Sequence, residues 1–269
     1  MGTVVRLECE WCRTQNATGD VSCRSCGAPL DVQNLVSDSG WREAPRLRDM
    51  TKVHFGASTC QVEGEIVPVF EVDLGPGESV YFEHHVLLWK EDRVPTAVLP
   101  LTGVVKRLLT GMPLVITTAT GPGRVAFSRD ATGELVLMPL QPGAQLDVRE
   151  HAFVLASRAV DYSYLRIKGL RNMLFGGQGM FMDRFVAAGG PGLLVLHGYG
   201  NVFERRLAAG ENILVEPGAF LYKDATVTMQ VEMQRLSTGW LGGMGMSLVR
   251  MTGPGRLGIQ SMYHHHKTD

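Results

Sequence analysis

Three segments of this chain carry the same landmarks in the same order, and this repetition constrains the fold more than any other feature of the sequence. The first landmark is a turn glycine, at Gly77, Gly143 and Gly210. The second is the position eight residues later, which holds His85, His151 and Gly218. The third is a Gly-Pro-Gly triplet, at residues 121–123, 190–192 and 253–255. The turn glycines are 66 and 67 residues apart. Self-similarity at a fixed period indicates one structural unit used several times. We therefore expect repeats over about residues 65–128, 135–197 and 201–262.

Each repeat is expected to be built from short β-strands. Short apolar runs stand on both sides of each Gly-Pro-Gly triplet, for example at residues 180–186 and 193–196. Because such runs bounded by Gly and Pro are typical of strands, we predict an all-β fold with a hairpin around each triplet. The segments 98–110 and 162–172 are the two places where we expect a short helix.

Four of the five cysteines lie in the first 26 residues, as two Cys-x2-Cys pairs: Cys9, Cys12, Cys23 and Cys26. Each pair places two thiolates on one tight turn, and two such turns complete a tetrahedral site that suits zinc. Four thiolates leave no open coordination position, so the predicted zinc is structural and not catalytic. The alternatives are two disulfides, which need an oxidising compartment, or a redox Cys-x2-Cys, which would not come as a matched pair. Cys60 stands alone and is expected to be a buried apolar residue.

The remaining boundaries follow from composition. We predict a zinc ribbon over 1–30, a linker over 31–50, the repeated β domain over 51–263 and a His-rich tail over 264–269. The linker shows no sustained apolar periodicity and contains Ser-Asp-Ser-Gly and Ala-Pro, which are typical of irregular chain. Its three arginines, Arg42, Arg46 and Arg48, are expected to be solvated, and contact with an acidic partner is the alternative.

The repeated domain resembles the AIM24 family. The resemblance rests on the Leu-x-Pro-Gly-Glu turn, the Ala-Phe-Leu run, and Gly-Gly-x-Gly-Met before Gly-Pro-Gly, and residues 175–180 and 198–200 match it well. In the first repeat, His84-His85 replace the usual Gly-Ala and the glycine-rich run is reduced to residues 111–113. The resemblance covers about residues 50–263. It implies three TRAP-like β-sandwich modules, similar to the subunit of the tryptophan-RNA-binding attenuation protein, about a pseudo-threefold axis. The family takes its name from a mitochondrial protein whose loss alters mitochondrial inheritance, and it brings no catalytic residues to this chain.

Composition excludes several functional classes. With 26 Lys and Arg against 27 Asp and Glu, the net charge is −1, so the chain lacks the positive charge of a DNA-binding protein, and RNA binding is disfavoured. Hydrophobic residues make up 45% of the chain, which excludes wholesale disorder. The longest apolar runs fall far short of the roughly 20 residues of a transmembrane helix, and no signal peptide begins the sequence. We therefore expect a cytoplasmic protein without a transmembrane segment.

The histidines are the remaining candidates for chemistry. His84 and His85 are adjacent, so along an extended strand their side chains point to opposite faces. The matched positions are His85, His151 and Gly218, so the third repeat lacks a ligand for a threefold metal site. The sequence contains no P-loop and no Gly-x-Ser-x-Gly elbow. We therefore expect no enzyme, with no catalytic and no cofactor-binding residues.

Together these features favour a noncatalytic scaffold that binds protein partners and carries a structural zinc module. A ligand- or RNA-binding regulatory protein, by analogy with the TRAP-like fold, is the alternative, although a fold alone is weak support for a function. An enzyme with an unrecognised site is a third alternative. Because three repeats can close their own threefold arrangement, we expect a monomer or a weak dimer.

Overall fold

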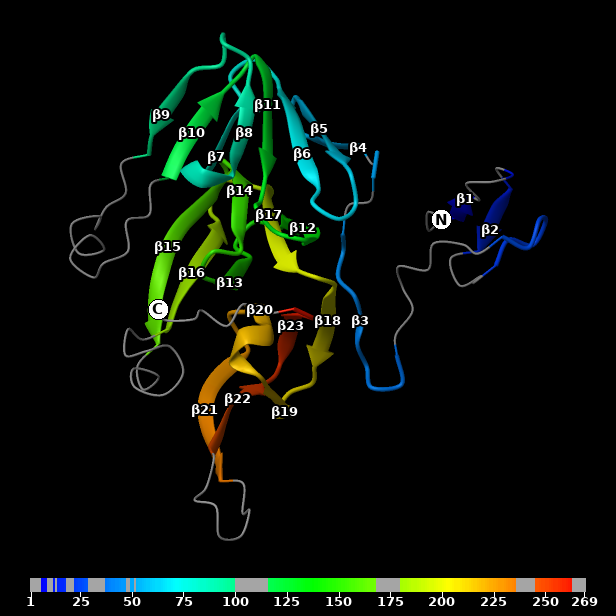
Figure 1. Ribbon diagram of the computed structural model, residues 1–269, viewed down its shortest axis with the longest axis vertical. Coiled ribbons are helices and arrows are strands. Elements are labelled where there is room, and N and C mark those ends of the chain that lie inside the picture. The colour runs from blue at the N-terminus through cyan, green and yellow to red at the C-terminus, as the bar shows by residue number, and fades with distance from the viewer. Residues whose placement is uncertain are drawn as a thin grey trace.

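The structure is a computed structural model that describes residues 6–8, 12, 14–17, 22–28, 37–46, 49–50, 52–99, 116–167, 180–235 and 245–262. The described elements are β-strands and two 3₁₀ turns, η1 (His84–Val86) and η2 (Pro217–Ala219), so the predicted all-β fold is confirmed (Figure 1). The glycine-rich runs at 176–179 and 242–243 and the tail 264–269 lie outside the described residues.

Six strands recur in the same order in three consecutive segments. In each segment the first, sixth and third strands form one sheet, and the second, fifth and fourth strands form another. The strands are, in the first segment, β6 (Val69–Leu74), β7 (Ser79–Glu83), β8 (Leu87–Lys90), β9 (Thr96–Val98), β10 (Ile116–Thr120) and β11 (Gly123–Ser128); in the second, β12 (Gly133–Leu140), β13 (Gln145–Arg149), β14 (Phe153–Ser157), β15 (Val160–Ile167), β16 (Met180–Ala187) and β17 (Gly192–Tyr199); in the third, β18 (Val202–Leu207), β19 (Asn212–Val215), β20 (Phe220–Asp224), β21 (Thr228–Arg235), β22 (Gly245–Thr252) and β23 (Gly255–Gln260). An arrangement of the three segments about a pseudo-threefold axis stays a prediction.

The turn between the first and second strands has the same backbone conformation in all three segments. The φ angles of Gly77, Gly143 and Gly210 are +77°, +80° and +76°, a region that glycine adopts without steric cost. Each turn is closed by one backbone hydrogen bond from an N–H group to the carbonyl oxygen three residues earlier. These bonds are Glu78 to Gly75 at 3.1 Å, Ala144 to Gln141 at 2.8 Å and Glu211 to Ala208 at 3.1 Å. The matched glycines of the sequence therefore stand in three turns of like geometry.

The Gly-Pro-Gly triplets connect two sheets and do not close hairpins. β10 pairs with β7 and β9, whereas β11, which follows the triplet, pairs with β6 and β8. The same change of sheet occurs between β16 and β17 and between β22 and β23, so the hairpin prediction is wrong at all three sites. The reason is a long-range pairing that the local pattern does not contain. The strand after each triplet pairs with the first strand of its own segment, in the register Leu74↔Gly123, Leu140↔Gly192 and Leu207↔Gly255.

The expected helices are also corrected where the structure describes them. Tyr162–Ile167 belongs to β15 and pairs along its whole length with β16. Its aromatic residues suit a pleated surface, and this tertiary pairing outweighs the local pattern. Val98 ends β9, while residues 100–110 and 168–172 lie outside the described residues.

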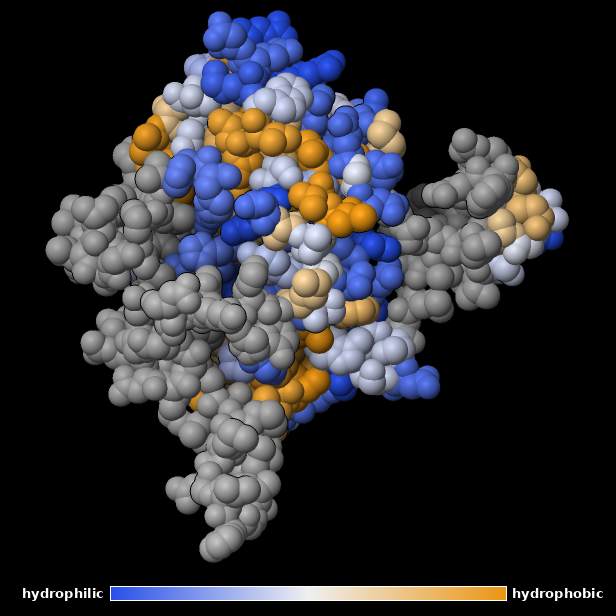
Figure 2. Space-filling model, viewed as in Figure 1, coloured by the Kyte–Doolittle hydropathy of each residue, from blue (hydrophilic) through white to orange (hydrophobic). Residues whose placement is uncertain are grey.

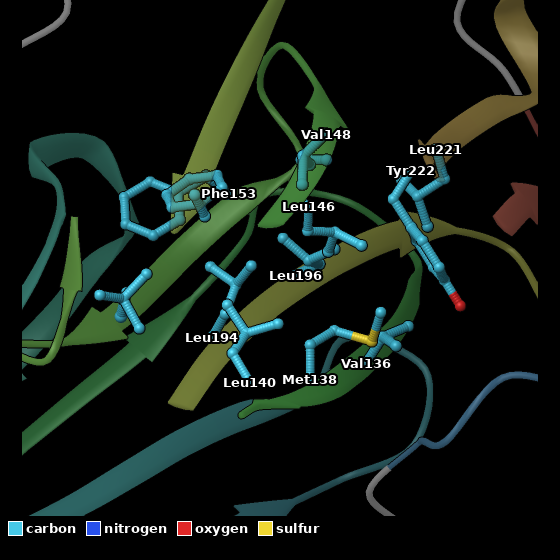
Figure 3. Packing of buried hydrophobic residues seen from close by; sticks show 14 of the residues in the cluster. Val136, Met138, Leu140, Leu146, Val148, Phe153, Leu194, Leu196, Leu221 and Tyr222 are labelled. Carbon is cyan, nitrogen blue, oxygen red and sulfur yellow. The ribbon is translucent and has the colours of Figure 1, made fainter. Parts of the chain in front are cut away.

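Each segment has a hydrophobic cluster that joins its two sheets, as a β-sandwich requires. In the second segment, buried residues of β12, β13 and β17 interdigitate; those labelled in Figure 3 include Val136, Met138, Leu146, Val148, Leu194 and Leu196. The clusters of the first and third segments likewise draw on both of their sheets. In β17, for example, Leu194 and Leu196 face the core of the second segment, which its two sheets share.

Two junctions join neighbouring segments edge to edge into larger sheets. β7 pairs with β14, and β13 pairs with β20, both antiparallel. When the segments are matched by their landmarks, the register is the same at both junctions. At the first junction the pairs are Phe82↔Leu155, Tyr81↔Ala156 and Val80↔Ser157. At the second they are Val148↔Tyr222, Asp147↔Lys223 and Leu146↔Asp224. A β-bulge occurs at the same place in the third strand of each segment, at Leu88, Val154 and Leu221. Neighbouring segments are therefore linked by one repeated strand pairing.

The residues before the first segment also take part in the sheets. β4 (Lys52–Phe55) and β5 (Ser58–Glu63) extend the sheet of β6, and β3 (Arg42–Glu43) pairs with β18. Residues 42–46, expected in the linker, therefore lie against the β domain. Arg42 forms an ion pair with Glu204, and Arg46 forms one of 2.6 Å with Glu134, so these two arginines are not simply solvated. Arg48 lies outside the described residues.

At the first and third Gly-Pro-Gly triplets, Gly121 and Gly253 lie so close to the backbone of the turn between the first and second strands that they leave no room for a side chain. A Cβ on Gly253 would lie 2.2 Å from the carbonyl oxygen of Ala208. We expect Gly253→Ala to destabilise the domain by about 1–3 kcal/mol, because backbone must move to relieve the contact. Gly189→Ala is the matched control: its Cβ would lie 3.4 Å from the nearest atom, so its effect should stay within about 0.5 kcal/mol. Urea unfolding of both variants tests this, and equal midpoints would contradict it.

Candidate metal centre and an open sheet edge

Three of the four cysteines predicted as metal ligands lie together, beside the hairpin of β1 (Arg6–Glu8) and β2 (Gln15–Ala17). The Sγ atoms of Cys12, Cys23 and Cys26 all lie within 4.8 Å of one another, and those of Cys12 and Cys23 are 3.5 Å apart. Sulfur atoms bound to one tetrahedral zinc ion are about 3.8 Å apart, so the three thiols could hold one metal ion. The fourth predicted ligand, Cys9, lies outside the described residues.

Hydrogen bonds around these sulfurs favour the thiolate form that binds metals. The N–H of Ser25 and the side-chain amide of Asn16 both donate to Cys23 Sγ, at 3.4 and 3.8 Å. A hydrogen bond with the Thr14 side chain, 3.2 Å away, is the main cause that lowers the pKa of Cys12 to about 6. A backbone hydrogen bond at Cys26 is the main cause that lowers the pKa of Cys23. The Cys-x2-Cys spacing predicted the ligands but gave no sign of these supporting groups.

Cys60 behaves differently from the clustered cysteines. It is buried on β5, and burial raises the pKa of its thiol to about 12. The thiol donates a weak hydrogen bond of 3.5 Å to the carbonyl oxygen of Val53. The expectation of a buried apolar residue is therefore confirmed, and Cys60 stays outside the metal cluster.

The histidines do not join a three-ligand cluster among the described residues. His84 and His85 lie in η1, and His85 Nε2 is 3.2 Å from Glu83 Oε2. His197 is buried at the end of β17, where burial first and the Arg129 charge second lower its pKa to about 4. A neutral, buried His197 suits a packing role.

A buried ion-pair cluster spans the junction of β13 and β20. Asp147 Oδ1 accepts a hydrogen bond of 2.7 Å from Arg184 on β16, and Oδ2 accepts one of 2.8 Å from Lys223 on β20. Burial alone would raise the pKa of Asp147, but the hydrogen bonds and charges of Arg184 and Lys223 outweigh burial and hold that pKa below its usual value. These ion pairs therefore stabilise the contact between the second and third segments.

The edge of β8 exposes apolar side chains that are buried in the other two segments. Leu88 and Trp89 are 55% and 41% exposed. The residues at the matched positions of β14 and β20, which are Val154, Leu155, Leu221 and Tyr222, are at most 1% exposed. β14 and β20 each have a neighbouring strand from another segment along this edge, whereas β8 pairs with β11 and with no other described strand. Hydrophobic residues also gather over the position of β8 and β11 in Figure 2.

β19 is the second edge without a partner among the described strands. It pairs with β22 only, while its counterparts β7 and β13 each pair with a further segment. Ile213 and Leu214 are half-buried, whereas Val80 and Tyr81 at the matched positions of β7 are buried. We expected a monomer or a weak dimer because three repeats could close a threefold arrangement. The third junction of such an arrangement, between β8 and β19, is not formed among the described strands.

The chain is thus an all-β protein whose described strands form several sheets, with a thiol cluster before them. The model of the family described as "Mitochondrial biogenesis AIM24" matches residues 60–262, so the chain belongs to the AIM24 family, as the resemblance indicated. Among solved structures, an X-ray crystal structure of a Streptococcus pyogenes protein from a structural genomics consortium is similar, with a TM-score of 0.58 and 20% identity over 77% of this chain and 94% of that chain. That likeness concerns the fold. No curated protein matches the chain, and in its described part no helix is long and apolar enough to cross a membrane.

The ion pairs of Asp147 should dominate the stability of the second junction. Asp147→Ala leaves Lys223 buried without its carboxylate, so we expect a loss of about 3–5 kcal/mol. Asp73→Ala is the matched control, because Asp73 lies 3.7 Å from Arg124 on the surface and such pairs contribute at most about 1 kcal/mol.

The contribution of Asp147 to the free energy of unfolding should also depend on pH. Because the pKa of Asp147 is lowered in the folded state, this contribution is present above the ordinary pKa of 3.8 and is lost as the pH falls through the folded-state pKa. Urea unfolding at neutral and acidic pH measures both effects. Equal losses for the two variants would contradict the assignment.

Proposed function

We propose that this protein is a noncatalytic scaffold that docks a protein strand along the open edge of β8. The observation that carries this proposal is the exposure of Leu88 and Trp89, at positions that strand pairing buries in the other two segments. An exposed sheet edge with apolar side chains is a template for β-augmentation, in which main-chain hydrogen bonds provide affinity and side-chain contacts provide specificity.

The buried charges support a structural role for the β domain. Asp147 is engaged by Arg184 and Lys223, and Glu204 is engaged by Arg42 and by the hydroxyl of Tyr222 at 2.9 Å. These carboxylates join strands of neighbouring segments or of one sheet, so they stabilise the fold. A cytoplasmic setting, in which thiols stay reduced, agrees with the clustered thiols of Cys12, Cys23 and Cys26.

The N-terminal module is proposed to be a structural zinc ribbon, with Cys9, Cys12, Cys23 and Cys26 as ligands. Three of these sulfurs are already spaced for one ion, and thiolates are ligands that zinc prefers. The described core of the module consists of Cys23 with Ala28 against it, so metal binding would supply most of its folding free energy.

Zinc binding is tested on freshly purified, reduced protein. We expect about one equivalent of zinc, and we expect Cys23→Ser to lose it while the melting of the β domain is unchanged, because β1 pairs with β2 alone among the described strands. Cys60→Ala is the control that should keep the metal. A reduced wild-type protein without zinc, or a Cys23→Ser variant that keeps it, would contradict the proposal.

Strand docking is tested by affinity capture from the native lysate with three baits: wild type, Trp89→Lys and Ile66→Lys. Ile66 is 72% exposed in the loop between β5 and β6, so its variant adds the same charge away from the edge. Proteins retained by the wild type and Ile66→Lys should be lost from Trp89→Lys. Recovery of one common set by all three baits would refute docking at this edge.

A further inference from the structure

We propose that the occupant of the β8 edge is β19 of a second copy of this chain, so that copies join head to tail. This inference rests on the proposed function, because it names the partner of the same edge. It follows from the two junctions that the chain already contains, in which a third strand pairs with the second strand of a neighbouring segment. β8 and β19 are the third strand and the second strand that are left.

The register of the new junction is given by the two existing ones. At both, the residue after the bulge lies opposite the matched position of the second strand, as Leu155 lies opposite Phe82 and Tyr222 opposite Val148. The same rule places Trp89 opposite Val215, Lys90 opposite Leu214 and Glu91 opposite Ile213. The residues at the matched positions of the second junction, such as Tyr222 and Val148, form the corresponding pairs within the chain.

The residues around this register correspond to those of the buried cluster at the second junction, with one difference. At the second junction, Asp147 on β13 lies opposite Arg184 of its own segment and opposite Lys223 of the third segment. The corresponding residues at the open edges are Leu214, which lies opposite Arg250 in its own sheet, and Lys90. The open edges therefore carry cations at both matched positions and leucine in place of the aspartate. In the single chain, Arg250 is paired with Glu232 at 2.5 Å, and Lys90 donates a hydrogen bond of 2.9 Å to the carbonyl oxygen of Val94.

A second copy supplies β19 without any rearrangement of the chain. β8 and β19 of one chain lie toward opposite ends of the long axis (Figure 1), so pairing within the chain would require the segments to move. The two edges are different surfaces, so the contact between copies is heterologous and generates a ring or a filament.

The assembly is measured by light scattering and sedimentation of the full chain over a range of concentrations. We expect the wild type and Ile66→Lys to form species above the chain mass of 29.4 kDa that grow with concentration. Trp89→Lys places a charge in the junction, and Leu214→Lys places a like charge opposite Lys90. Each should raise the dissociation constant at least about tenfold. A wild type that stays monomeric, or variants that assemble like the wild type, would overturn the proposal.

Mixing the two blocked variants tests the head-to-tail direction. Trp89→Lys keeps its β19 edge, and Leu214→Lys keeps its β8 edge. An equimolar mixture should therefore give a complex of one chain of each variant and nothing larger. Larger species or no complex would contradict the pairing of β8 with β19.

A charge swap at Leu214 tests the register. Leu214→Asp recreates the aspartate of the buried cluster, with Arg250 beside it and Lys90 of the next copy opposite, so it should assemble at least as tightly as the wild type. Assembly of Leu214→Asp as weak as that of Leu214→Lys would refute the register. If copies fail to assemble while the baits still capture other proteins through Trp89, this inference fails and the proposed function stands. If both fail, the edge is not a docking surface.

Discussion

Backbone pairing between the third strand of one segment and the second strand of the next is the interaction on which the rest of the structure depends. It joins three-stranded sheets into sheets of six strands, one of which β3 extends to seven. It also buries residues such as Val154 and Tyr222 that would otherwise face solvent. Unpaired backbone groups and apolar side chains at a sheet edge are costly to leave exposed. Among the described strands, the three segments form two such junctions, and β8 and β19 are left without one.

The parts of the fold that could be predicted from the sequence are those set by local chemistry. Glycine is needed at Gly77, Gly143 and Gly210 because the turns require positive φ, and the spacing of these glycines reveals the repeat. The paired Cys-x2-Cys spacing correctly predicts that Cys12, Cys23 and Cys26 lie together, because the spacing is typical of two thiols on one tight turn, as is seen for Cys23 and Cys26. The family resemblance points to the same β architecture.

The parts that could not be predicted are those decided by contacts between distant residues. Two apolar runs around Gly-Pro-Gly look alike whether they form a hairpin or enter two sheets, and the pairing of Gly123 with Leu74 decides the outcome. Arg42 and Arg46 resemble solvated linker residues until Glu204 and Glu134 are brought beside them. The exposure of Trp89 depends on whether a neighbouring strand is present, and no local pattern records that.

By our proposal, β8 is an open edge in one chain and becomes a paired strand between copies. Hydrogen exchange of the wild-type protein, followed at low and high concentration, tests it most directly. In dilute protein the amides of Leu87–Lys90 should exchange much faster than those of Phe220–Asp224, which are paired on both sides, and at high concentration the β8 amides should become protected. Protection of the β8 amides to the level of β20 in the dilute monomer would contradict the account, because it would mean that the edge is already covered within one chain.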